Sequence, residues 1–155
     1  MEKYILKVLD EDYAKEICGW IYEGDHSVYN FSDWDTVKEN GWDLSIKEKR
    51  ESEFIAILYD EELIGYGRIT SNNGKTFIGI GLKPSWCGKG YGGNVMKLLV
   101  EEAQKKFPEQ TIVLEVRTFN IRAIKCYEKI GFEAREKYIK NTFQGKDEFI
   151  YMEYV

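Results

Sequence analysis

The sequence predicts a mixed α/β fold of the α+β kind, in which helices flank a largely antiparallel sheet. Three observations support this class. Runs with strand-like alternation recur along the chain, amphipathic helical patterns separate the later runs, and Asn72-Asn73-Gly74 is typical of a hairpin turn. The chain has 155 residues, about the length of one domain, so we expect residues 1–155 to form a single domain.

The N-terminal part predicts one strand and one amphipathic helix. Residues 4–9 alternate as a strand, and Asp10 is placed to cap the helix that follows. The apolar residues of this helix recur at helical spacing on one face. They are Tyr13, Ile17, Trp20 and Ile21.

A loop, a second helix and three strands follow. Residues 23–31 form a polar and aromatic loop, Ser32 is placed to cap a short helix over 33–40, and residues 41–52 are charged and ambiguous. The three strands span 53–59, 63–71 and 76–82, joined by turns at 60–62 and 72–74.

The second half alternates helices and strands after a glycine-rich loop. The expected elements are a helix over 92–106, a strand over 111–117, a helix over 120–130 and strands over 133–140 and 148–155. Gly131 is placed to end the second of these helices, and Gln144-Gly145 to turn the last two strands. The order is β-α-α-β-β-β-α-β-α-β-β, with about seven strands, about four helices and one strand-helix-strand crossover.

Composition excludes several functional classes. With 22 basic and 27 acidic residues the net charge is −5, which argues against a nucleic-acid surface and favours cationic partners. One histidine and three scattered cysteines suggest neither a His-based triad nor a metal site. We find no signal peptide or membrane span and expect a cytoplasmic protein, monomeric or homodimeric.

The loop at residues 84–93 is the most informative stretch. Its four glycines allow backbone N–H groups to turn toward an anion, and the following helix points its positive end at the same place. Lys89 is followed by Gly90 rather than Ser or Thr, so a P-loop is excluded. The spacing Gly88-x-Gly90-x-x-Gly93 matches a dinucleotide fingerprint, but residues 83–87 separate it from the preceding strand.

Together with the segment that precedes it, this loop resembles the acyl-CoA loop of the GNAT superfamily of N-acetyltransferases. Gly90 and Gly92 match the pattern Arg/Gln-x-x-Gly-x-Gly/Ala, whereas Cys87 replaces its usual Arg or Gln. A second motif runs from Leu114-Glu115-Val116-Arg117 through Asn120 and Tyr127 to Gly131-Phe132. This half is similar to the ribosomal-protein alanine N-acetyltransferase group, and so is the tail over residues 140–152.

The resemblance implies acetyl transfer from acetyl-CoA to a primary amine by direct attack through a tetrahedral intermediate. Glu115 corresponds to the general base, with a strand carboxylate paired to Arg117 or a nearby lysine as the alternative. Tyr127 corresponds to the acid that protonates the leaving thiolate, and a backbone N–H near Leu82 to the oxyanion hole. The acceptor is a small-molecule amine or a peptide N-terminus, and no metal is implied.

The same resemblance assigns binding roles. Lys89 and Arg122 are placed to meet phosphates, and Asn120 either contacts the pantetheine arm or simply caps its helix. The expected acetyl-CoA contacts are Leu82, Cys87, Gly88, Lys89, Gly90, Tyr91, Gly92, Gly93, Asn120 and Ala123. The expected acceptor contacts are Trp20, Tyr22, Tyr29, Asn30 and Tyr138. A CoA-responsive module without efficient turnover stays open as a second function, because of Cys87 and because the strand over 76–82 carries no acid.

Overall fold

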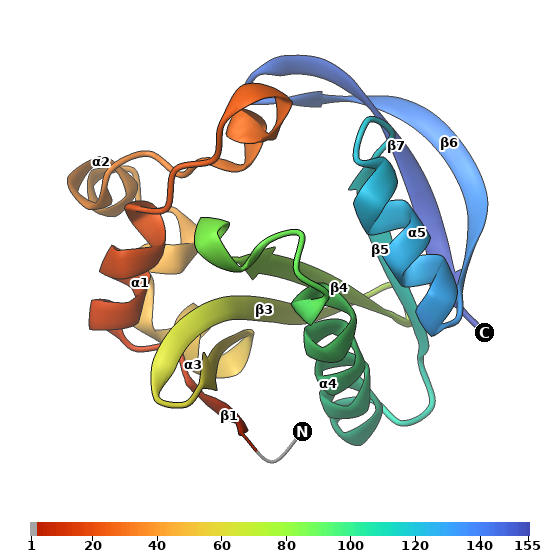
Figure 1. Cartoon of the computed structure of the whole chain (residues 1–155), viewed down its shortest axis with the longest axis horizontal. Helices are drawn as coiled ribbons and strands as arrows, with labels where there is room; N and C mark the ends of the chain where they lie inside the picture. The colour runs from red at the N-terminus through yellow and green to blue at the C-terminus, as the bar shows by residue number, and fades with distance from the viewer. Residues whose placement is uncertain (1–2) are drawn as a thin grey trace. The chain divides into compact units, whose positions relative to one another are not determined.

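Seven strands form one mixed sheet in the computed structural model, which describes residues 3–155 (Figure 1). The strands are β1 (Tyr4–Val8), β2 (Phe54–Tyr59), β3 (Glu62–Asn72), β4 (Lys75–Leu82), β5 (Thr111–Arg117), β6 (Phe132–Thr142) and β7 (Gly145–Tyr154). Their order is β1-β2-β3-β4-β5-β7-β6. β1–β2, β2–β3, β5–β7 and β6–β7 pair antiparallel and β4–β5 parallel, which confirms the predicted sheet.

The described residues form five α-helices and three short 3-10 helices. The α-helices are α1 (Glu11–Cys18), α2 (Trp34–Glu39), α3 (Lys47–Ser52), α4 (Tyr91–Lys106) and α5 (Ile121–Ile130), and the 3-10 helices are η1 (Gly24–Tyr29), η2 (Asp43–Ser45) and η3 (Pro84–Trp86). α3 falls in the charged segment that carried no clear pattern. The side chain it buries is Arg50, which donates to the Leu44 carbonyl at 3.1 Å, so hydrophobic periodicity had nothing to detect.

The chain divides into two compact units, and the first comprises the residues up to Arg68 together with Ile80–Cys87. Asp10 caps α1 as predicted, because its Oδ1 accepts from the amide of Tyr13 at 2.8 Å. The predicted apolar face reaching Ile21 is wrong. α1 ends at Cys18, the amide of Gly19 closes onto the Glu16 carbonyl, and Ile21 is 60% exposed.

Buried apolar residues from α1, α2, η2, β2 and β3 make the core of this first unit, and Trp20 is among them. The expected cap of α2 by Ser32 is wrong by one residue, since Asp33 is the N-cap and its Oδ1 accepts from the Thr36 hydroxyl at 2.6 Å. The segment over 23–31 is also more regular than a loop, because η1 occupies most of it.

The second unit comprises Ile69–Gly79 and Gly88–Val155. Here the start of β4 pairs in parallel with the start of β5, and α4 makes the crossover between them. The side chains that α4 buries include three of its four predicted face residues, Val95, Leu99 and Ala103, while Leu98 is half-buried. β5 is buried at four of its seven positions and exposed at Glu115.

α5 and the β6–β7 hairpin complete this unit. Figure 1 shows α5 lying along the part of the sheet formed by β5, β7 and β6. Gly131 ends α5 with a φ of +127°, as predicted. The hairpin turn is Phe143-Gln144 rather than Gln144-Gly145, because Gly145 already pairs with Thr142 as the first residue of β7.

Candidate active site

The glycine loop passes twice through the left-handed backbone region before α4 begins. Gly88 has a φ of +72° and Gly90 a φ of +89°, and a side chain is disfavoured at both positions. Gly90 is the N-cap of α4. The first amides of a helix lack carbonyl partners within it, so the loop directs backbone donors and the positive end of the dipole to one place. Such an arrangement binds anions.

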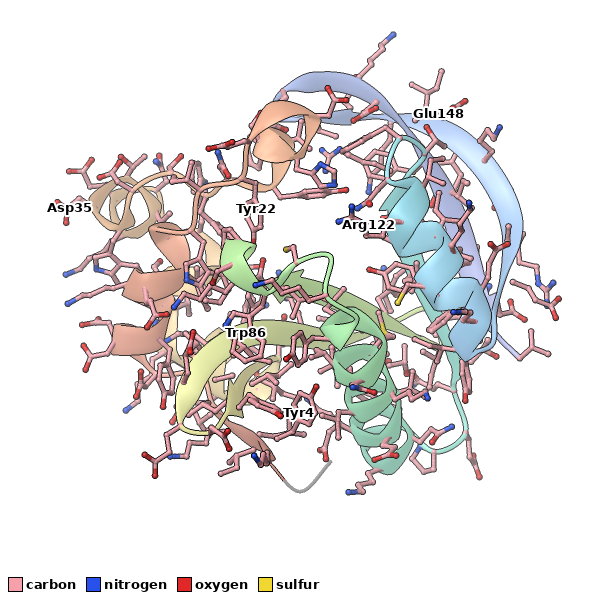
Figure 2. All side chains as sticks on the ribbon, in the orientation of Figure 1. Tyr4, Tyr22, Asp35, Trp86, Arg122 and Glu148 are labelled. Carbon is pink, nitrogen blue, oxygen red and sulfur yellow. The ribbon has the colours of Figure 1, made fainter. Side chains whose placement is uncertain are left out.

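A cation from α5 lies beside this loop. A β-carbon built on Gly88 would lie 2.7 Å from Nη1 of Arg122, which projects from the first turn of α5 (Figure 2). A β-carbon built on Gly90 would meet no heavy atom within 4 Å, and Lys89 between the two glycines is exposed. Open backbone, a guanidinium and an ammonium fit a diphosphate group such as the one in CoA.

The start of α5 also borders α4. Asn120 is the N-cap of α5, and its Oδ1 accepts from the amide of Ala123 at 3.3 Å, so the capping role of Asn120 is confirmed. One turn later, Cys126 faces Gly93 in the first turn of α4, where a β-carbon would lie 3.7 Å from its Sγ. The first turn of α4 therefore meets the middle of α5 at two small residues, Gly93 and Cys126.

Glu115 projects from β5 into a cluster of polar side chains from β6. Its Oε1 accepts from Nζ of Lys140 at 2.7 Å, and its Oε2 accepts a short hydrogen bond from the Tyr138 hydroxyl. Burial and this hydrogen bond raise the pKa of Tyr138, so its hydroxyl stays protonated. The predicted acceptor contact Tyr138 is thus brought together with the predicted base.

Sequence reasoning left two partners open for Glu115, and the structure identifies the lysine as Lys140. Arg117 pairs elsewhere, since its Nε donates to Oδ2 of Asp147 at 2.8 Å. Lys140 itself was not singled out as a site residue. The available signal was its two-residue spacing from Tyr138, which places both side chains on one face of a strand.

Tyr127, the predicted acid, lies on α5 and is half-buried. Its ring packs edge-on against Phe132, with the centroids 6.2 Å apart. Phe132 in turn packs against Tyr154 at 5.3 Å. The contact with Phe132 fixes the ring at the end of α5 that leads into β6.

The predicted acceptor residues of the first unit have structural partners. Trp20 is 6% exposed and belongs to the core. Tyr22 donates its hydroxyl in a short hydrogen bond to the Leu82 carbonyl, and its amide donates to Oδ1 of Asn30 at 2.7 Å. Tyr29 packs edge-on against Tyr22, with the centroids 6.5 Å apart. Tyr22, labelled in Figure 2, therefore ties this segment to the end of β4.

Cys87 is exposed, and its Sγ lies 3.7 Å from the Leu82 carbonyl and 3.6 Å from the Lys83 carbonyl. Within residues 3–155, no group of three or more His, Cys, Asp or Glu side chains is arranged to hold a metal ion. No helix in the described part of the chain is long and apolar enough to cross a membrane.

The chain matches one known protein family by sequence. The sequence profile of the acetyltransferase (GNAT) family matches residues 11–132. A search of curated protein sequences gives no match.

Solved structures share the fold at low sequence identity. The ribosomal-protein-S18-alanine N-acetyltransferase from Escherichia coli is 18% identical with a TM-score of 0.67, over 97% of this chain and 92% of that one. A spermidine N-acetyltransferase chimera from Vibrio cholerae and hSSAT is 18% identical with a TM-score of 0.78, over 99% and 95%. AAC(6′)-Ib, solved with paromomycin and acetyl-CoA, is 24% identical with a TM-score of 0.71, over 96% and 92%.

Proposed function

We propose, from the premise that the chain belongs to the acetyltransferase (GNAT) family, that it transfers an acetyl group from acetyl-CoA to a primary amine. The observation that carries the proposal is the glycine loop. Gly88 and Gly90 open its backbone at the start of α4, and Arg122 lies beside it. This is the combination that a diphosphate needs.

Arg122, Lys89 and the amides of residues 88–93 would hold the diphosphate of the cosubstrate. Asn120 and Ala123 at the start of α5 would contact its pantetheine arm. Tyr91, Gly92 and Gly93 would contact the part of acetyl-CoA that lies nearest α4. Leu82 would contribute the backbone donor of an oxyanion hole, and Cys87 would border the loop. When bound, acetyl-CoA supplies an activated acetyl thioester.

Glu115 and Tyr127 would carry the proton transfers. An alkyl ammonium has a pKa of about 10, so near pH 7 it must lose a proton before its nitrogen can attack. Glu115 is an exposed residue of β5 and presents a carboxylate, and we assign it the role of base. Tyr127 would donate a proton to the departing sulfur, which leaves more readily as a thiol than as a thiolate.

The acceptor class is an amine of a small molecule or a peptide N-terminus. The structures with the same fold include a ribosomal-protein alanine N-acetyltransferase and a spermidine N-acetyltransferase chimera, and one was solved with paromomycin. A net charge of −5 suits a cationic acceptor. The proposed acceptor contacts remain Tyr138, Tyr22, Tyr29 and Asn30. Trp20 would act through packing, because it is buried.

One observation favours a second function, a CoA-responsive module without efficient turnover. The carboxylate of Glu115 is already engaged by Lys140 and Tyr138, so an incoming ammonium must displace or share a partner. Both functions require CoA binding. They differ in whether added amine drives thiol release.

Thiol release from acetyl-CoA, measured against a panel of polyamines, aminoglycosides and N-terminal peptides, tests the proposal. We expect release that depends on at least one amine and falls by about 100-fold in Glu115→Gln, the usual scale of a lost general base. Glu133→Gln on β6 is the matched control and keeps the wild-type rate. CoA binding without amine-dependent release would support the binding module instead.

A further inference from the structure

An ammonium already lies on the candidate base. Nζ of Lys140 is 2.7 Å from Oε1 of Glu115, within hydrogen-bond distance. The other carboxylate oxygen is taken by the Tyr138 hydroxyl. The Lys140 side chain is 45% exposed and that of Glu115 is 28% exposed, so the pair lies at the surface and is open to reagents.

The groups around Nζ of Lys140 favour an alkyl ammonium at this position. The Lys140 ammonium lies 4.7 Å from the centroid of the Phe149 ring, a favourable cation–π distance. The Arg117 guanidinium also lies near this ring, at 5.0 Å, and it is engaged by Asp147. Lys140 is therefore the cation that pairs with Glu115, between a carboxylate and an aromatic face.

We propose that Lys140 is an internal acceptor and that the chain acetylates its own Lys140. The inference rests on the proposed function and follows from it geometrically. If Glu115 takes the proton of the acceptor amine, the acceptor nitrogen must lie within hydrogen-bond distance of its carboxylate. Nζ of Lys140 meets this condition. Because Lys140 belongs to the same chain as Glu115, the amine is present at a high effective concentration.

The step balances as an ordinary acyl transfer. Glu115 takes one proton from the Lys140 ammonium, and the nitrogen lone pair forms a bond to the acetyl carbonyl carbon. The carbon–sulfur bond breaks with its electron pair going to sulfur, which takes a proton from Tyr127. The nitrogen then loses its second proton, which reprotonates Tyr127, and Glu115 releases the first proton to solvent. The products are acetylated Lys140, free CoA thiol and one proton. Acetylation removes the charge of Lys140 and frees the Glu115 carboxylate.

Incubation of the full chain with acetyl-CoA carrying a ¹³C-labelled acetyl group, followed by peptide mass spectrometry, tests this proposal. Lys137 is the internal control, because it is an exposed lysine on the same strand and strand alternation places it on the opposite face. We expect label at Lys140 at least about tenfold faster than at Lys137, and about 100-fold slower in Glu115→Gln than in wild type. The rate per molecule stays constant across protein concentrations, as a reaction within one chain requires.

Equal labelling of Lys140 and Lys137, or Lys140 labelling that is unchanged in Glu115→Gln, overturns the proposal as background chemistry. Amine-dependent thiol release with an unlabelled Lys140 also overturns it and leaves the acetyltransferase function intact. Lys140→Arg keeps the charge and must abolish the label at this position. Absence of both label and amine-dependent release rejects the proposed function together with the inference.

Discussion

Nη1 of Arg122 lies 2.7 Å from the point that a β-carbon on Gly88 would occupy. The closeness means that Gly88 is required for two reasons, its φ of +72° and the guanidinium beside it. The first reason concerns the backbone alone. The second concerns the placement of a cation at the loop that we propose binds the CoA diphosphate.

Gly88→Ala and Gly74→Ala should therefore differ in their effect on CoA binding. Both glycines have a similar positive φ, but a β-carbon on Gly74 meets no atom within 4 Å. Each variant should lower the free energy of unfolding by about 1 kcal/mol from backbone strain. Only Gly88→Ala should weaken CoA binding, by about tenfold or more, because it displaces Arg122. Calorimetric titration with CoA checks this, and equal affinities in the two variants would contradict it.

Tyr127→Phe should slow amine-dependent thiol release by at least about tenfold and leave the Kd for CoA within about twofold, because the variant removes only a proton donor. Tyr154→Phe is the matched control, since both tyrosine rings pack edge-on against Phe132. It should keep the wild-type rate. Equal rates in Tyr127→Phe and Tyr154→Phe would remove Tyr127 from the mechanism.

Tyr22→Phe removes the hydrogen bond to the Leu82 carbonyl and should cost about 1 kcal/mol of unfolding free energy at pH 7. Tyr13→Phe, a half-buried tyrosine packed against the same core, is the control and should cost less than about 0.5 kcal/mol. Urea unfolding of both variants checks the difference. A Tyr22→Phe variant as stable as Tyr13→Phe would contradict the role of this hydroxyl.

Alkaline pH should destabilise the first unit through two tyrosines. Burial, followed by Tyr66 and Cys87, raises the pKa of Tyr22, and burial with a smaller contribution from Cys18 raises the pKa of Tyr66 to about 12. Because the unfolded pKa is about 10, their stabilisation is complete below that pH and is lost as pH rises through the folded values. Urea midpoints measured from pH 8 to 11 should fall above about pH 10, and less steeply in Tyr22→Phe. Midpoints that do not change above pH 10 would contradict this.

Acid should destabilise the same unit through Glu53. Burial opposes its ionisation, but hydrogen bonds from Arg68 and Lys49 outweigh this effect and lower the pKa of Glu53. Its stabilisation is complete above the unfolded value of about 4.3 and is lost as pH falls through the folded value. Glu53→Gln should therefore cost roughly 1 kcal/mol at pH 7 and converge with wild type near pH 3. Glu51→Gln, an exposed neighbour on α3, should match wild type throughout.

Hydrophobic periodicity and turn chemistry predicted the sheet, the crossover and the boundaries of β5 from the sequence. They failed where another interaction set the local structure. Gly19 ends α1 before Ile21, and the charged α3 buries an arginine instead of an apolar face. The N-cap of α2 is Asp33 rather than the predicted Ser32. Ser and Asp are nearly equivalent N-caps, and these two residues are adjacent in the sequence.

The family resemblance predicted Glu115 as the base and Tyr138 as an acceptor contact, yet only the structure shows that they share a hydrogen bond. The spacing of Lys140 from Tyr138 predicts that both lie on one face of a strand, but whether that face meets Glu115 depends on strand register, and the register of β6 on β7 shifts between Ala134 and Glu136. A shift of one residue reverses which face a side chain occupies, and no local pattern predicted it.

The central claim is that Glu115 acts as the base in acetyl transfer to an amine. Thiol release from acetyl-CoA, followed with and without amine in wild type and Glu115→Gln at matched CoA occupancy, tests it most directly. We expect amine-dependent release in wild type and about 100-fold less in Glu115→Gln. Amine-dependent release at the same rate in both proteins would contradict it.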